Sequence, residues 1–375
     1  MTAQFGDEER AALADSVKGL LDRRSDSTSV RQFTEGGGFD RDLWREIAEL
    51  GWHALLVPEE FEGAGAGLWA TTMVLEGLGH HTTPGPYLSS SVLAVTALAA
   101  APSTALRKQW LPGIAAGEVI GAVALAGTSG RAHVDLLPIV LHGGSGGGHL
   151  DGVAPFVLDG ADADVLVVGA RSSDGPAIVA VPAASARAER RPSIDRTRSL
   201  ADLSFESIHL DADSVIAVGE DAATLLDRIV DFGAVALAAD AMGAAGRAFD
   251  LALEYAKQRE QFGRPIGSFQ AIKHKLADMY VLATSAEAAI RGAAGSIDRG
   301  DASARRRAAV AGLYGRKAAA NIAGEAVQIH GGIGYTWEHD CHLLLKRTKL
   351  DLLLLSDTWT DGERIVASVC PTGES

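Results

Sequence analysis

The chain carries Arg259-Glu260-Gln261-Phe262-Gly263, with Gln270 shortly beyond, and later Gln328-Ile329-His330-Gly331-Gly332-Ile333-Gly334-Tyr335. A guanidinium offers forked donors to phosphate oxygens, and an aromatic face suits a flat heteroaromatic ring. Glycines let backbone amides approach a phosphate or an adenine edge that a Cβ would obstruct. Alone, the first stretch could be a surface arginine beside a core phenylalanine, and the second a glycine helix stop. Together they indicate one ligand site built from two segments.

Helical periodicity surrounds both stretches and predicts a four-helix bundle over residues 220–375. The expected helical segments are Asp231–Arg259, one that follows Gln270, Ala302–Ala326 and Asp340–Leu355. Residues 1–117 also read as helices with short breaks. Between 118 and 219, β-branched runs such as Val165–Val168 and Ala177–Val181 alternate with turn residues and predict a β domain. The predicted fold is mainly α with a central β domain.

A run of glycines lies inside the predicted β domain, from His142 to His149. It lacks the lysine and the strand-to-helix setting of a phosphate-binding loop, so we expect a hairpin tip.

Composition excludes several partners. The chain has 375 residues, enough for two or three domains, and a net charge of −14 that repels nucleic acid and anionic membrane surfaces. Two cysteines, Cys341 and Cys370, argue against a disulfide scaffold. No basic and apolar leader is visible at Met1, and prolines shorten the uncharged run Thr82–Leu106 to a segment that we expect to be a buried helix. The expected location is the cytoplasm.

The two glycine- and arginine-bearing stretches, with the loop Leu56–Gly65, resemble the acyl-CoA dehydrogenase family of flavoproteins. The order of helical domain, β domain and helical bundle is similar to that family over nearly the whole chain. The resemblance implies FAD as cofactor, an acyl-CoA thioester as substrate and an electron-transfer flavoprotein as electron acceptor. It also implies that Arg259 pairs with the diphosphate of a neighbouring subunit's FAD, that Phe262 packs at its adenosine end, and that Gln270 joins them.

The glycine-rich stretch would belong to the same neighbouring site, with Gln328, Gly331 and Gly332 as its cofactor contacts. The family's own-subunit half of the FAD site is much less recognisable. Its threonine–glutamate loop is replaced by Val123–Arg131, where only Thr128 and Ser129 are candidate flavin contacts, and its tryptophan is replaced by Phe156.

The family's catalytic glutamate is missing. In members of the family, this glutamate removes an α-proton from the acyl group while a hydride leaves the β-carbon for the flavin. Counting from Gly331 places the usual glutamate position at Leu355, and counting from Arg259 places the alternative position at Gly233. Asp357 is the nearest carboxylate in the sequence and a weak candidate for the base.

Four functions stay open from the sequence. The first is a base-lacking subunit that completes the FAD site of a base-bearing partner, resembling one chain of actinobacterial heteromeric dehydrogenases of steroid side-chain breakdown. The second is a self-sufficient homotetramer that uses Asp357, the third a flavin monooxygenase, and the fourth a structural or regulatory paralogue. His339-Asp340-Cys341-His342 is explained by the family pattern, so no metal is expected. The acyl group is not specified, although composition favours a steroid-derived or branched one.

Overall fold

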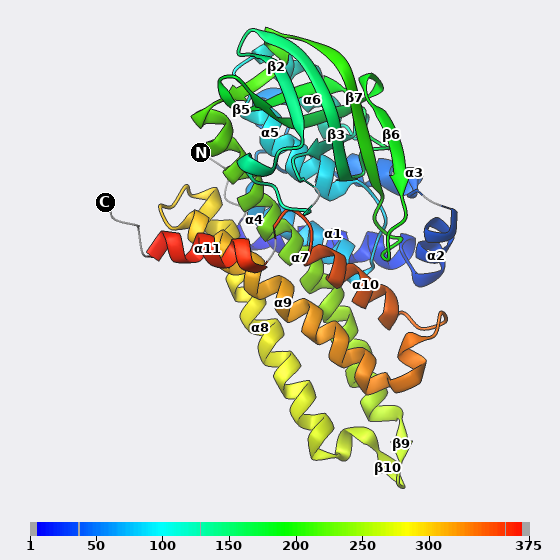
Figure 1. The fold of residues 1–375 in the computed structure, drawn as a ribbon. Coiled ribbons are helices and arrows are strands. Elements are labelled where there is room, and N and C mark those ends of the chain that lie inside the picture. Colours follow the sequence, from blue (N-terminus) through cyan, green and yellow to red (C-terminus); the bar gives the residue numbers. More distant parts are fainter. Residues whose placement is uncertain (1–5, 37, 128, 357, 370–375) are drawn as a thin grey trace.

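The computed structural model describes residues 6–36, 38–127, 129–356 and 358–369 (Figure 1). Its first part is helical, as the sequence predicted. The elements are α1 (Asp7–Arg24), α2 (Ser27–Gly36), α3 (Arg41–Glu49), η1 (Trp52–Ala54), η2 (Glu59–Phe61), α4 (Gly67–His80), the π-helical η3 (Leu88–Ala94), α5 (Val95–Ala99) and α6 (Thr104–Ala115). Side chains cap several of these helices; for example, Asp40 accepts from the amides of Asp42 and Leu43, and Ser103 accepts from that of Leu106.

The middle of the chain forms one mixed eight-stranded sheet. Its strands are β1 (Gly121–Ala124), β2 (Ile139–Gly144), β3 (Gly147–Leu158), β4 (Val165–Ser172), β5 (Gly175–Pro182), β6 (Arg187–Arg191), β7 (Leu200–Asp211) and β8 (Val215–Val218). They run in the order β6-β7-β3-β2-β4-β5-β8, and β1 pairs in parallel with β4. The glycine run is the tip of the β2–β3 hairpin, with Gly143 opposite Gly148, so the hairpin prediction is confirmed. Short turns also occur at η4 (Val134–Leu136), η5 (Ala183–Ser185) and η6 (Ala212–Ser214).

The last part of the chain is the helical bundle. It contains α7 (Glu220–Gln258), β9 (Glu260–Gln261), β10 (Arg264–Pro265), η7 (Ile266–Ser268), α8 (Gln270–Asp298), α9 (Ala304–His330), η8 (Gly331–Tyr335), α10 (Cys341–Asp351) and α11 (Thr358–Val369). The long helix α7 runs from the sheet to the far end of the molecule, where the small β9–β10 hairpin projects (Figure 1).

Two boundaries differ from the sequence prediction. Helix α7 begins at Glu220 rather than near Asp231. Helix α10 ends at Asp351, so Leu355 lies in the following turn with a φ of +64° and not on a helix. Helical periodicity could not reveal that end, because Leu352 to Leu355 continue the apolar pattern without a proline or glycine.

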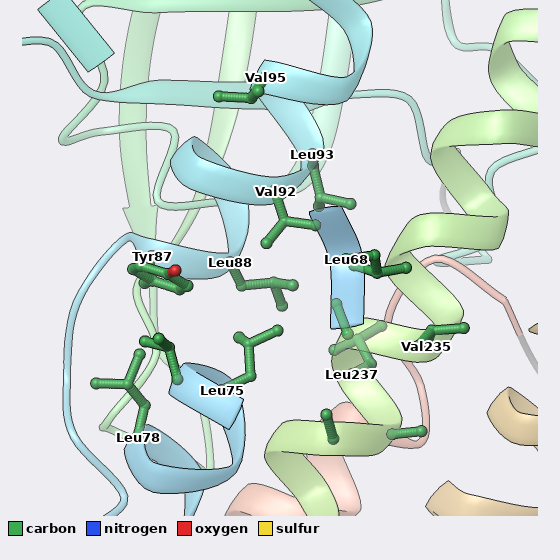
Figure 2. Packing of buried hydrophobic residues seen from close by; sticks show 14 of the residues in the cluster. Leu68, Leu75, Leu78, Tyr87, Leu88, Val92, Leu93, Val95, Val235 and Leu237 are labelled. Carbon is green, nitrogen blue, oxygen red and sulfur yellow. The ribbon is translucent and has the colours of Figure 1, made fainter. Parts of the chain in front are cut away.

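The core is continuous between the first and last parts of the chain. Leucines of α4 and η3 interdigitate with Val235 and Leu237 of α7 (Figure 2). Helix α4 crosses α7 closely, because a Cβ on Gly79 would overlap the carbonyl oxygen of Asp240 and one on Gly243 that of Glu76. The expected buried helix is confirmed: Leu88–Ala99 is helical throughout and almost wholly buried.

A buried ionic network joins the loop before β7 to the bundle. Arg347 of α10 donates to Asp240 of α7 (3.0 Å) and to Asp195 (3.2 Å), while Arg198 donates to Asp240 and to Asp351 (both 2.9 Å). Burial raises the pKa of Asp351. Burial also opposes ionisation of Asp240, but Arg347 and Arg198 hold its pKa below the usual value. Of these two carboxyls, the network therefore favours protonation of Asp351 and ionisation of Asp240.

Among the described residues, helix α7 is long and apolar enough to cross a membrane. Most of its apolar window, 78%, is buried inside the protein, which is the setting of a core helix.

Candidate cofactor and active site

The Arg259 motif forms an exposed hairpin at the end of α7. Arg259 ends the helix, and its carbonyl accepts from the amide of Ile266 (2.8 Å), which closes the loop. Phe262 is 92% exposed at the tip, with a φ of +54°, and Gly263 follows with a φ of +76°. The only ring near Phe262 in the part of the chain that the structure describes is Phe269, with centroids 6.2 Å apart. A large apolar side chain held out in this way is suited to contact with another chain.

The Gln328 motif lies at the same end of the bundle. Gln328 is on the last turn of α9, and Gly331 has a φ of +63°, a conformation that glycine adopts readily. Gln328, Gly331 and Gly332 are all exposed. His330 stacks on Tyr255, one turn before Arg259, with ring centroids 4.5 Å apart and planes at 29°. This ring contact brings the two motif-bearing helix ends together.

The two positions expected for a glutamate lie against each other. A Cβ on Gly233 would overlap Cδ1 of Leu355 and would lie 3.0 Å from Cδ2 of Leu93. Counting from two separate motifs therefore leads to one point in the structure. Neither residue has a group that can accept a proton, and no carboxylate lines the cavity at this point among the residues that the structure describes.

A small apolar cavity of about 50 Å³ lies at this point. Its lining is Leu88, Leu93, Val123, Leu125, Ala126, Gly130, Pro155, Phe156, Val157, Leu158, Leu237, Leu354 and Leu355. No lining side chain bears a polar group. Small-molecule pockets usually enclose about 300–1,000 Å³ and place polar groups to orient the ligand. Among the described residues, this cavity alone is therefore too small, and its side chains too apolar, to hold and orient a three-ring flavin.

One candidate for an own-subunit flavin contact, Phe156, lies at this cavity. Phe156 lines it, is 49% exposed and has a φ of +54°. Ser129 is exposed in the loop before Ala132, and the amide of Ala132 donates to the carbonyl of Leu355 (2.8 Å). That bond fastens the loop to the turn that follows α10 and contains Leu355, which we call the leucine turn. Thr128 and Asp357 lie outside the described residues.

A fully buried arginine, which the sequence did not reveal, holds the leucine turn. Arg316 of α9 donates to the carbonyls of Asp351 and Leu354 (both 3.2 Å) and to Ser356 Oγ (2.9 Å), and it also pairs with Asp361 of α11. The sequence signal that could have indicated this role is an arginine within the alanine-rich helix α9. A charged residue on a helix that is largely buried needs polar partners.

A second ion pair lies on α7 close to Gly233. Arg364 of α11 pairs with Asp231, which is two residues before Gly233. Burial raises the pKa of Asp231 to about 6, and Arg364 opposes that rise. The carboxylate closest in sequence to Gly233 is therefore engaged by a neighbouring helix.

Three possible metal ligands meet near the second motif. Ligand atoms of His330, His339 and Cys341 lie within 4.8 Å of one another. His330 Nδ1 donates to the carbonyl of Ala326 (2.7 Å), while His339 Nδ1 accepts from the amide of Cys341 (3.2 Å). Burial raises the pKa of the Cys341 thiol to about 12. A thiol ligates as its thiolate, and burial favours the protonated form of this one when no ion is bound.

Comparison with known proteins identifies the class. Models of the N-terminal and C-terminal domains of acyl-CoA dehydrogenases match residues 7–118 and 224–354. The chain is 32% identical to acyl-CoA dehydrogenase IpdE2 of Mycolicibacterium smegmatis, over 96% of this chain and 99% of the relative. It belongs to the acyl-CoA dehydrogenase family, whose members are FAD-dependent flavoproteins that oxidise acyl-CoA substrates.

Two solved assemblies are similar along almost the full chain. The ChsE4-ChsE5 complex of Mycobacterium tuberculosis gives a TM-score of 0.89 at 29% identity, covering 99% of both chains. A variant of the steroid acyl-CoA dehydrogenase Tcur3481-Tcur3483 gives 0.89 at 27% identity, covering 98% of this chain and 99% of the other. The resemblance to the actinobacterial steroid type is thus confirmed.

Proposed function

We propose that this chain is one subunit of a heteromeric FAD-dependent acyl-CoA dehydrogenase. In that role it completes the FAD site of a partner subunit that supplies the catalytic base. The observation that carries the proposal is the contact between Gly233 and Leu355. These residues stand at the two positions where the family's glutamate is expected, and a cavity of about 50 Å³ lies beside them.

Arg259, Phe262, Gln270, Gln328, Gly331 and Gly332 would form this chain's contribution to the partner's site. The Arg259 guanidinium is exposed at the end of α7 and can offer paired donors to a diphosphate. Phe262 at the hairpin tip can pack on an adenine ring, and the exposed glycines leave backbone amides accessible. These residues fit a flavin dinucleotide from a neighbouring subunit, whereas the small cavity does not.

The division of chemistry follows from this arrangement. When bound, FAD would supply the redox chemistry as the acceptor of a hydride from the acyl β-carbon. This chain would bind and orient the phosphate and adenosine end and exclude water there. The partner's carboxylate would take the α-proton. Electrons would then pass to an electron-transfer flavoprotein. The expected location of the assembly is the cytoplasm.

The similarity to the ChsE4-ChsE5 complex and to the Tcur3481-Tcur3483 pair supports a two-chain assembly. It also supports a steroid-derived or branched acyl group as the substrate class. The acyl group would be bound mainly by the partner, because this chain's own cavity has no room for it.

The visible flavin spectrum tests the proposal. The chain is purified alone and again after co-expression with a base-bearing acyl-CoA dehydrogenase chain, and FAD is measured per mole of protein. We expect FAD and acyl-CoA oxidation only in the mixed assembly. Stoichiometric FAD and oxidation at rates typical of the family in the chain alone would contradict the proposal.

A further inference from the structure

A large pocket lies away from the apolar cavity and from the exposed hairpin. Its volume is about 610 Å³, within the usual range for small-molecule sites. The walls come from α1, α4, α7 and α8. It shares no lining residue with the apolar cavity beside Leu355. The pocket is therefore a second, independent feature of the molecule.

One wall has an unsatisfied buried acceptor. Oε2 of Glu76 receives a hydrogen bond from Arg291 (3.1 Å), but Oε1 is buried without a partner among the described residues. A buried polar atom without a hydrogen bond costs about 1–3 kcal/mol. Burial also raises the pKa of Glu76 to about 7. A hydroxyl or amino group in the pocket would satisfy this oxygen.

Another wall has an unpaired cation. Arg247 of α7 is half-buried and makes no hydrogen bond or close ion pair with the residues that the structure describes, although its charge acts on the carboxylate of Asp250, one helical turn further along and also in the pocket lining. Burial lowers the pKa of the neighbouring His80 to about 4, so that ring is neutral at pH 7. Lys18 is already paired with Asp22. Arg247 is thus the wall's available guanidinium, and its geometry suits a carboxylate.

An apolar wall is formed by Val17, Leu21, Met73 and Met242, while the carboxylates of Asp22, Asp250 and Glu287 also line the pocket. Methionine side chains adapt readily to ligands of different shape. Gly246 also lines the pocket, and a Cβ added there would meet no atom within 4 Å. The pocket therefore has open space directly above that glycine.

From these contacts we infer that the pocket binds an amphipathic organic anion of small-molecule size. The carboxylate of the ligand pairs with Arg247, its hydrocarbon body lies on the valine, leucine and methionine wall, and a hydroxyl or amino group donates to Glu76 Oε1. This inference does not depend on the proposed dehydrogenase function.

Three soluble probes separate the two polar contacts: 8-hydroxyoctanoate, octanoate and 1,8-octanediol. Their dissociation constants are measured by calorimetry on the full-length chain in the assembly in which it purifies. We expect 8-hydroxyoctanoate to bind, and removal of either polar end to weaken binding roughly tenfold or more. Absence of binding by 8-hydroxyoctanoate at 10 mM or so, far above typical site affinities, would overturn the inference.

A Cβ at Gly246 meets no atom within 4 Å, so Gly246→Leu places its side chain in the pocket, and leucine also favours the helix. It should abolish binding while leaving assembly unchanged and thermal stability equal to or above that of the wild type. Gly362→Leu is the matched control, since Gly362 on α11 also has open space around its Cβ and lies outside the pocket. Arg247→Met should remove the preference for 8-hydroxyoctanoate over 1,8-octanediol. Unchanged binding in Gly246→Leu would show that the probes bind outside this pocket, in the partner subunit for example, and would contradict the inference.

Discussion

Gly233 and Leu355 meet at one point in the structure, although their positions are 122 apart in the sequence. A side chain at position 233 would displace the leucine, and the leucine fills the space that such a side chain would need. The two substitutions are therefore coupled by packing. Restoring one carboxylate would not restore the site, because the surrounding cavity is small and wholly apolar.

Leu355→Glu should therefore fail to create a self-sufficient enzyme. A carboxylate in an apolar cavity loses hydration, so we expect its pKa to rise and the free energy of unfolding to fall by about 1–3 kcal/mol. The measurements are FAD content, acyl-CoA oxidation and urea unfolding of the chain prepared without a partner. Leu353→Glu, at a leucine of the same turn that is 63% exposed, is the control and should change stability by less than about 0.5 kcal/mol. Dehydrogenation by Leu355→Glu alone would contradict the proposed division of roles.

Arg259→Gln should lower the FAD content of the mixed assembly without changing the unfolding of this chain. The side chain is exposed, so its removal leaves no unpaired buried group. A lost charge-assisted contact to phosphate costs about 1.5–3 kcal/mol, which corresponds to a roughly tenfold or greater weakening of FAD binding. Flavin release under dilution measures the effect. Lys257→Gln removes a nearby exposed cation and should leave FAD content unchanged. Equal losses in the two variants would indicate general electrostatics and not a specific contact.

Arg316→Met should strongly destabilise the fold. Arg316 and Asp361 are both fully buried, and removal of one partner of such a pair costs about 3–5 kcal/mol. The loss appears in the midpoint of urea unfolding. The double variant Arg316→Met, Asp361→Leu removes the stranded carboxylate as well, so it should be more stable than Arg316→Met. A double variant that is less stable than the single one would show that the arginine acts mainly through the carbonyls of the leucine turn.

Asp159 should make stability depend on pH. Burial raises its pKa to about 7, while the hydroxyl of Ser89, which donates to it at 2.6 Å, opposes the rise. The folded state then binds a proton more tightly than the unfolded chain, so this group's stabilisation is complete below about pH 4 and is lost as pH rises towards 7.

Asp159→Asn removes that titration. The difference in unfolding free energy between wild type and variant should shift against the wild type by a few kcal/mol between pH 4 and pH 7. Urea titrations at several pH values measure it, with Asp135→Asn at an exposed carboxylate as the control for net charge. A constant difference across this pH range would contradict the assignment.

Much of the architecture could be predicted from local pattern. The period of apolar residues separated the β part from the helical parts, and glycines marked the β2–β3 turn. Counting from two motifs found Gly233 and Leu355. Their contact could not be predicted, because it depends on how the turn after α10 folds back onto α7. The roles of Arg316 and of the pocket beside Glu76 were also hidden, since they depend on tertiary contacts among helices distant in sequence.

The protruding hairpin has a consequence for synthesis in the cell. Phe262 is 92% exposed at a loop tip, and exposed loop tips are preferred sites of proteolytic cleavage. A partner subunit that covered the tip would protect it. Copies made in excess of the partner would keep it open to proteases, so degradation at this hairpin would adjust the amounts of the two chains to each other.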